Sequence, residues 1–116
     1  MSEAARESIL SPENTIYYST ASLWEIAIKN QKAPDRCPYN EKDVERFCEK
    51  AGFLPMSIRN EYVTGLRELK VRPGRCLRNY DPFVRILLSQ ARAEGCRLMT
   101  HDANMANYQE DCIFVI

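Results

Sequence analysis

Residues 79–102 read NYDPFVRILLSQARAEGCRLMTHD, and the other segments of the chain can be placed around them. Asp81 followed by Pro82 is typical of a helix N-terminus, because the carboxylate accepts a backbone N–H and proline has no amide hydrogen to lose there. Apolar side chains then recur at helical spacing, opposite a face that carries Arg85, Ser89 and Arg92, and they form an inward stripe of Phe83, Val84, Ile86, Leu87, Leu88 and Ala91. Gly95 ends the pattern, since glycine readily adopts the left-handed conformation that closes helices. The stretch therefore predicts one amphipathic helix.

A short strand is predicted at residues 97–100, with His101 and Asp102 at its carboxyl end. In open α/β sheets, functional side chains gather at the carboxyl ends of the strands. Asp102 is therefore a candidate functional acid, although the ordinary role of an aspartate at such a place is that of a solvated turn residue. His101 has no serine or cysteine partner at a recognisable spacing, so we expect it to be a surface residue.

The remaining chain predicts helices that alternate with strands. The expected helices span residues 2–10, 20–30, 41–51 and 58–69, with a further turn at 104–108, and the other expected strands span residues 15–19, 53–56 and 112–116. Asn40 and Ser57 are placed to be N-caps. Phe47 and Val63 are expected on buried helix faces. This order predicts one domain, residues 1–116, of the α/β class: a three-layer sandwich with a mostly parallel central sheet.

The composition limits the class of protein. Sixteen basic and sixteen acidic side chains cancel, so no net charge points to a nucleic acid or a membrane. No apolar run is long enough to span a bilayer, and the N-terminus lacks the apolar segment of a signal peptide. Five cysteines, an odd number without metal-binding spacing, indicate free thiols in a reducing compartment. We therefore expect a cytoplasmic protein without a membrane anchor.

Three segments together resemble one known family. They are STASLWEIAIK at residues 19–29, DPFVRILLSQA at residues 81–91 and LMTHD at residues 98–102. In this order they are similar to motifs of PIN domains, in particular of the VapC-like toxin ribonucleases of bacterial toxin–antitoxin systems. The resemblance implies a parallel α/β sandwich that gathers three or four carboxylates at one end of its sheet. Those acids hold Mg²⁺ or Mn²⁺, which activates water for phosphodiester cleavage.

The resemblance assigns candidate site residues position by position. Glu25 falls on the family's second acid and Asp102 on its last acid, so both are candidate catalytic and metal-binding residues. Ser22 and Thr100 lie near these acids and are expected to support them. Asp81 keeps the first aspartate of the family's DPFD motif and is the third catalytic candidate.

Two of the family's acids have no counterpart in this sequence. Val84 stands where the family carries the second aspartate of DPFD, and no segment resembles the first strand with its acid. The chain is expected to begin inside the helix that follows that strand, and so to lack a strand that lies mid-sheet in the family. The resemblance therefore implies a degenerate site, in which binding of Mg²⁺ or Mn²⁺ is in question.

A basic run follows the fourth expected helix. Its cations are Arg67, Lys70, Arg72, Arg75 and Arg78, interrupted by Glu68. Such a run is ordinarily a solvated loop. It also fits a strip that contacts RNA backbone phosphates, and Arg85 is expected near it.

Other candidate residues also have structural explanations. Glu25 can pair with Lys29 one helical turn later, or it can complete a capping box with Ser22. Trp24 is expected in the core rather than as a platform for base stacking.

Three functions remain open from the sequence. The first is a degenerate PIN-domain protein with little or no catalysis. The second is an active Mg²⁺- or Mn²⁺-dependent endoribonuclease that rebuilds its site with Asp81 or with acids from a second chain. The third is a non-catalytic dimer that binds RNA or a protein. A homodimer is expected because loss of a central strand exposes apolar faces, and RNA and an antitoxin-like protein are the candidate partners.

Overall fold

The computed structural model describes residues 2–73, 81–100, 105 and 107–115. The chain divides into two compact units, Ile9–Ser57 and Met1–Ser8 together with Ile58–Ile116. We call them the N-terminal unit and the C-terminal unit. Helix α1, Glu3–Leu10, begins in one unit and ends in the other, and the Oγ of Ser2 accepts the N–H of Ala5 at 3.1 Å.

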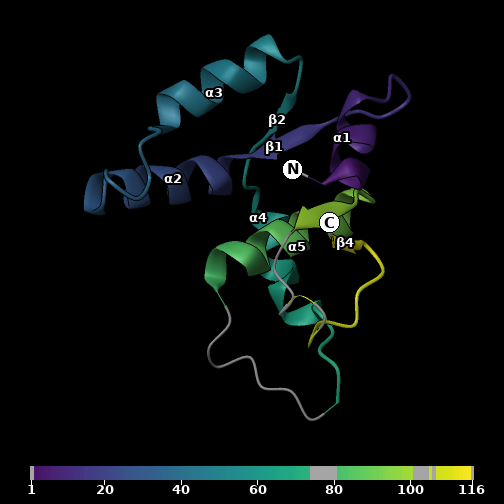
Figure 1. Cartoon of the computed structure of the whole chain (residues 1–116). Helices are drawn as coiled ribbons and strands as arrows, with labels where there is room; N and C mark the ends of the chain where they lie inside the picture. The colour runs from purple at the N-terminus through teal and green to yellow at the C-terminus, as the bar shows by residue number, and fades with distance from the viewer. Residues whose placement is uncertain (1, 74–80, 101–104, 106, 116) are drawn as a thin grey trace. The chain divides into compact units, whose positions relative to one another are not determined.

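The N-terminal unit is a β-α-α-β segment (Figure 1). Its elements are β1 Tyr17–Ser19, α2 Thr20–Lys32, α3 Glu41–Lys50 and β2 Leu54–Met56. Strands β1 and β2 pair in parallel, with Ser19 opposite Met56. Helices α2 and α3 lie side by side in Figure 1, joined by the loop that carries Pro34 and Pro38.

Local hydrogen bonds account for where these two helices begin and end. The Oγ of Ser19 accepts the N–H of Ala21 at 3.1 Å, so the last residue of β1 is also the N-cap of α2. Asn40 caps α3 as predicted, through a 2.8 Å bond from the N–H of Asp43 to its Oδ1. Gly52 follows α3 with φ +81°, a conformation that favours glycine.

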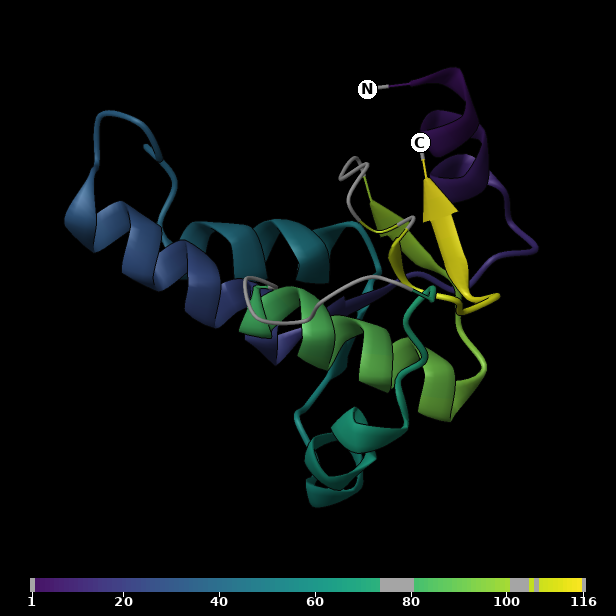
Figure 2. The ribbon, with the colours of Figure 1, turned by 90° about the horizontal axis from the view of Figure 1, so that it is seen from below.

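The C-terminal unit contains a second parallel pair of strands. Its elements are α4 Asn60–Thr64, the 3₁₀ helix η1 Gly65–Glu68, α5 Pro82–Glu94, β3 Leu98–Thr100 and β4 Ile113–Val115. Strands β3 and β4 lie beside each other (Figure 2), with Leu98 opposite Ile113 and Thr100 opposite Val115. Helix α5 begins and ends at the predicted residues, since Asp81 Oδ1 accepts the N–H of Phe83 at 2.9 Å and Gly95 has φ +66°.

A hydrophobic core lies between α5, η1 and the segments next to β3 and β4. Its buried members are Leu69, Leu88, Met105 and Tyr108, and the partly buried side chains that pack against them are Leu66, Val71, Val84, Leu98, Cys112 and Ile113. All of these residues belong to the C-terminal unit. Val84 and Leu88 of the predicted inward stripe of α5 therefore lie in this core. Ser89, which was expected on the opposite polar face, is buried instead, because α4 covers it and its hydroxyl donates to the carbonyl of Tyr62 at 2.6 Å.

The helix expected at residues 58–69 is shorter than predicted and changes type. It starts at Asn60 after Arg59, with no side-chain cap, so the prediction of Ser57 as N-cap is wrong. It tightens into η1 at Gly65, where a Cβ would lie 3.3 Å from the Oγ of Ser89 on α5. Glycine has a low helix propensity, and close packing of α5 at this residue favours its small size.

Three side chains expected on buried helix faces are exposed instead. Trp24 is 58%, Phe47 65% and Val63 51% exposed. These predictions are wrong because apolar spacing along one helix shows which residues share a face, but not whether another element covers that face.

The prediction of an α/β fold with parallel strands is confirmed. Within the described residues, the four strands form two separate two-stranded sheets. The expected absence of the family's first strand stays a prediction. Over the same residues, no helix is both long enough and apolar enough to cross a membrane.

Candidate functional site

Glu25 lies on α2 of the N-terminal unit. Its Oε2 is 3.7 Å from the Nζ of Lys29, an i,i+4 ion pair, so the expected structural pairing is confirmed. The alternative capping box with Ser22 is wrong, because Ser19 caps the helix and Ser22 lies inside it. The side chains of Lys29 and Glu25 are 63% and 27% exposed, and a solvent-exposed pair of this kind contributes little to stability.

Asp81 is the N-cap of α5, and Val84 lies in the first turn of this helix. One carboxylate oxygen of Asp81 is engaged by the N–H of Phe83. Val84 packs against the core formed by Leu69, Leu88, Met105 and Tyr108. The position that carries the third acid in the resemblance therefore holds a side chain of the hydrophobic core.

Asp102 and His101 lie outside the described residues, as do Arg75 and Arg78 of the basic run. Thr100, the predicted supporting residue, is the last residue of β3 and is paired in register with Val115. Strand β3 thus ends at the residue that the sequence predicted, Thr100.

The described acids do not fit a divalent cation. Mg²⁺ and Mn²⁺ prefer several carboxylate oxygens converging on one point. Over residues 2–73, 81–100, 105 and 107–115, no three His, Cys, Asp or Glu side chains gather in this way. Glu25 pairs with Lys29, Asp81 caps a helix, and Val84 has no oxygen to offer.

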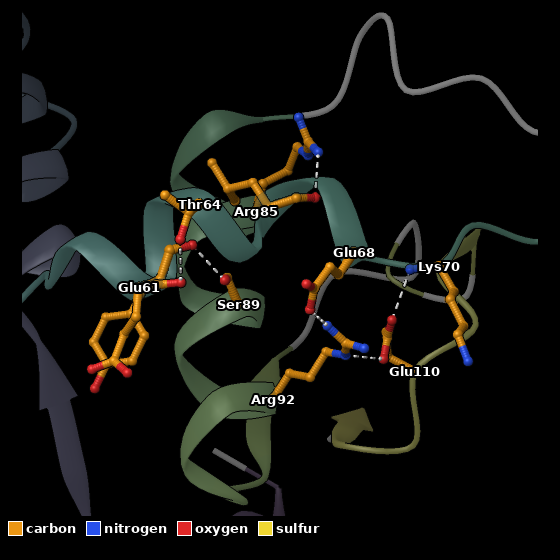
Figure 3. A network of polar contacts seen from close by, with 10 residues as sticks. Glu61, Thr64, Glu68, Lys70, Arg85, Ser89, Arg92 and Glu110 are labelled. Atoms are coloured by element: carbon orange, nitrogen blue, oxygen red, sulfur yellow. Dashed lines mark hydrogen bonds and ion pairs between the residues drawn. The ribbon is translucent and has the colours of Figure 1, made fainter.

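The start of the basic run, at Glu68 and Lys70, takes part in a polar network that the sequence did not reveal (Figure 3). Arg92 on α5 donates to Glu68 Oε2 at 3.1 Å and its Nε lies 3.3 Å from Glu110 Oε1. Glu110 Oε2 in turn accepts the backbone N–H of Lys70 at 2.7 Å. Arg85 donates to the carbonyl of Leu66 at 3.2 Å. Arg85 thus has a structural contact, and its contact with RNA stays a prediction.

A second cluster joins α4 to the end of α5. The hydroxyl of Tyr62 donates to Glu94 Oε1 at 2.6 Å, and Arg59 Nη2 lies 2.8 Å from the same oxygen. The guanidinium of Arg59 also lies 5.3 Å from the ring centre of Tyr62. The bond from Tyr62 lowers the pKa of Glu94, and the bond to Glu94 raises the pKa of Tyr62.

Neither Glu110 nor Glu94 was among the predicted site residues. Glu94 lies at the end of a helix and Glu110 in the loop before β4, and an acid at such a place is ordinarily solvated. The pairing of Glu110 with Lys70 spans 40 residues, so no local pattern could have indicated it.

Comparison with known families identifies the class of this protein. A model of the PIN domain matches residues 1–111. The chain therefore belongs to the PIN domain family, as its three motifs indicated. Proteins of this family are generally metal-dependent nucleases. Comparison with curated proteins and with solved structures gives no significant match.

Proposed function

We propose that this chain is a PIN-domain protein of the VapC toxin-ribonuclease type that binds RNA but has no appreciable ribonuclease activity. The observation that carries the proposal is the packing of Val84 against the hydrophobic core, at the position of the family's third acid. The motifs around Glu25 and Asp102 support the relation to toxin ribonucleases.

The physical reason is the poor donor set for a metal. Mg²⁺ gives up its water shell reluctantly and needs well-placed carboxylates. A loosely held metal does not fix the attacking water in line with the scissile bond, and positioning supplies much of the rate of phosphodiester cleavage. Glu25 and Asp102 offer two of the family's carboxylates, and Val84 removes negative charge from the place of a third.

The test is cleavage of a mixed-sequence RNA pool with Mn²⁺, followed by gel electrophoresis. Wild type, Glu25→Ala and Lys29→Ala are compared. The lysine variant is the matched control, because it breaks the same ion pair but leaves the acid in place. We expect no cleavage above background from any of the three. Cleavage by wild type and Lys29→Ala that disappears in Glu25→Ala would overturn the proposal and favour the active-enzyme interpretation.

A homodimer is the second part of the proposal, and exposed apolar side chains support it. Six large apolar residues of the N-terminal unit are exposed: Leu10, Tyr17, Trp24, Tyr39, Phe47 and Leu54. Aromatic side chains bury large areas when they are covered, so leaving four of them in water is unfavourable. A second copy of the chain offers the same surface, as a two-fold interface requires.

A further inference from the structure

The first residues of the basic run are paired with the segment that precedes β4. The carbonyl of Lys70 accepts the N–H of Gln109 at 2.7 Å, and the N–H of Arg72 donates to the carbonyl of Asn107 at 2.8 Å. Between them, Val71 and Tyr108 form an antiparallel bridge. Residues 70–72 therefore have a defined backbone position.

Glu110 completes this pairing with its side chain, which is only 8% exposed. One carboxylate oxygen accepts the N–H of Lys70 and the other lies 3.3 Å from Arg92. In Figure 3 the ammonium end of Lys70 points away from Glu110. The carboxylate thus holds the backbone of Lys70 and leaves its charge directed outward.

The charges around this segment are mixed. Glu68 and Glu110 both engage Arg92, and the side chains of Arg67, Lys70 and Arg72 are exposed at the surface. Asp111 is also exposed and works against binding of an anion. The buried carboxylate of Glu110 lies close to these cations and repels phosphate. It favours the binding of an anion only if another effect of the same side chain outweighs this repulsion.

We propose that Glu110 is a positioning residue for RNA binding: by holding the backbone of Lys70, it presents Lys70 and Arg72 to backbone phosphates of RNA. The inference rests on the proposed function, because it takes RNA as the ligand. In this role Glu110 strengthens the binding of RNA because it positions two cationic side chains, although its own negative charge repels phosphate.

The cations are tested first. Binding of a fluorescently labelled, mixed-sequence single-stranded RNA is measured by anisotropy over a series of KCl concentrations. If both side chains contact phosphates, Lys70→Gln with Arg72→Gln lowers the slope of log affinity against log salt by about 1.4, since each contact on a single strand contributes about 0.7. An unchanged slope would overturn the assignment of these two residues.

Glu110→Gln and Glu68→Gln then separate geometry from charge. Both variants remove one carboxylate from Arg92, but only Glu110 bonds the backbone of Lys70. Charge alone predicts tighter RNA binding for both. If Glu110 positions the cations, Glu110→Gln binds RNA at least about threefold more weakly than wild type, because one hydrogen bond to the backbone of Lys70 is weakened. Its slope of log affinity against log salt is also smaller. Glu68→Gln binds RNA as tightly as wild type or more tightly.

The outcomes distinguish the two proposals. Wild type that binds no RNA at low salt would overturn the proposed function itself. Wild type that binds RNA, with Glu110→Gln as tight as Glu68→Gln, would overturn only the role of Glu110. Should Glu110→Gln lose its circular dichroism spectrum, Glu110→Asp takes its place, since it keeps the charge and shortens the reach. Unchanged binding by that variant would also contradict the positioning role.

Discussion

The two units of this chain have similar local structure and very different interiors. Each has one pair of parallel strands and helices with defined caps. The C-terminal unit buries Leu88, Tyr62 and Met105 almost completely, whereas the buried residues of the N-terminal unit are Ser19, Ala21 and Cys48, among those that the structure describes. Hydrogen-bonded elements therefore form in both units, but a core of large side chains forms in one.

The difference shows what each unit depends on. Caps and short ladders contribute little free energy, because most helical stability comes from tertiary packing. A segment of about 50 residues without a large buried side chain is marginal by itself. We therefore expect the C-terminal unit to determine the stability of the chain, and the N-terminal unit to depend on what covers its apolar side chains.

The largest expected effect comes from Leu88→Ala. Leu88 is fully buried in the core of the C-terminal unit, so truncation loses apolar burial and leaves a cavity. We expect the free energy of unfolding in urea to fall by about 2–5 kcal/mol.

Val63→Ala is the matched control for Leu88→Ala, because it truncates a half-exposed side chain of the same unit. Its effect is expected to stay within about 0.5 kcal/mol. Equal losses for the two variants would mean that the core described here does not govern unfolding.

A smaller effect, dependent on pH, is expected for Tyr62→Phe. The hydroxyl of Tyr62 lowers the pKa of Glu94 from its ordinary 4.5, so ionised Glu94 stabilises the folded state. That contribution is present above the unfolded-state pKa and is lost as the pH falls through the lower folded-state pKa. Tyr62→Phe should therefore be less stable than wild type at neutral pH, with a difference that shrinks as the solution is acidified towards pH 3.

The check on Tyr62→Phe is urea unfolding of wild type and variant at neutral pH and at several acidic values. Glu61→Gln serves as control, because Glu61 pairs with the same Arg59 but has no bond to Tyr62. A difference between wild type and Tyr62→Phe that stays constant over this range would contradict the coupling to Glu94.

The smallest effect on stability is expected where the side chains are most exposed. Trp24→Ser with Phe47→Ser should change the free energy of unfolding of the monomer by no more than about 0.5 kcal/mol. The same variant should shift the sedimentation of the protein from dimer to monomer if these residues lie in the dimer interface. A wild type that is monomeric at high micromolar concentration would contradict the homodimer.

Local patterns predicted a large part of the fold. Asp81, Pro82 and Gly95 bound helix α5 at the predicted residues, and Asn40 caps α3 as expected. Such signals succeed because the hydrogen bonds of a cap join residues two or three positions apart. The PIN family could also be identified from the sequence, because its motifs lie in contiguous segments of the chain.

The candidate site was predicted less completely. The pairing of Glu25 with Lys29 followed from a spacing of four residues, and Val84 was expected in the core. The contacts of Glu110 with Lys70 and Arg92 did not follow from any spacing. They join residues 40 and 18 positions apart, as the numbering shows.

The sequence by itself determined the boundaries of most elements, the parallel α/β class and the PIN family, because each depends on near neighbours in the chain or on contiguous motifs. Only the tertiary structure determined three other features: the exposure of Trp24 and Phe47, the change from α4 to η1 at Gly65, and the burial of Glu110. The physical reason is that burial and polar pairing depend on which distant segment covers a face. A helix presents the same face whether or not another segment packs against it.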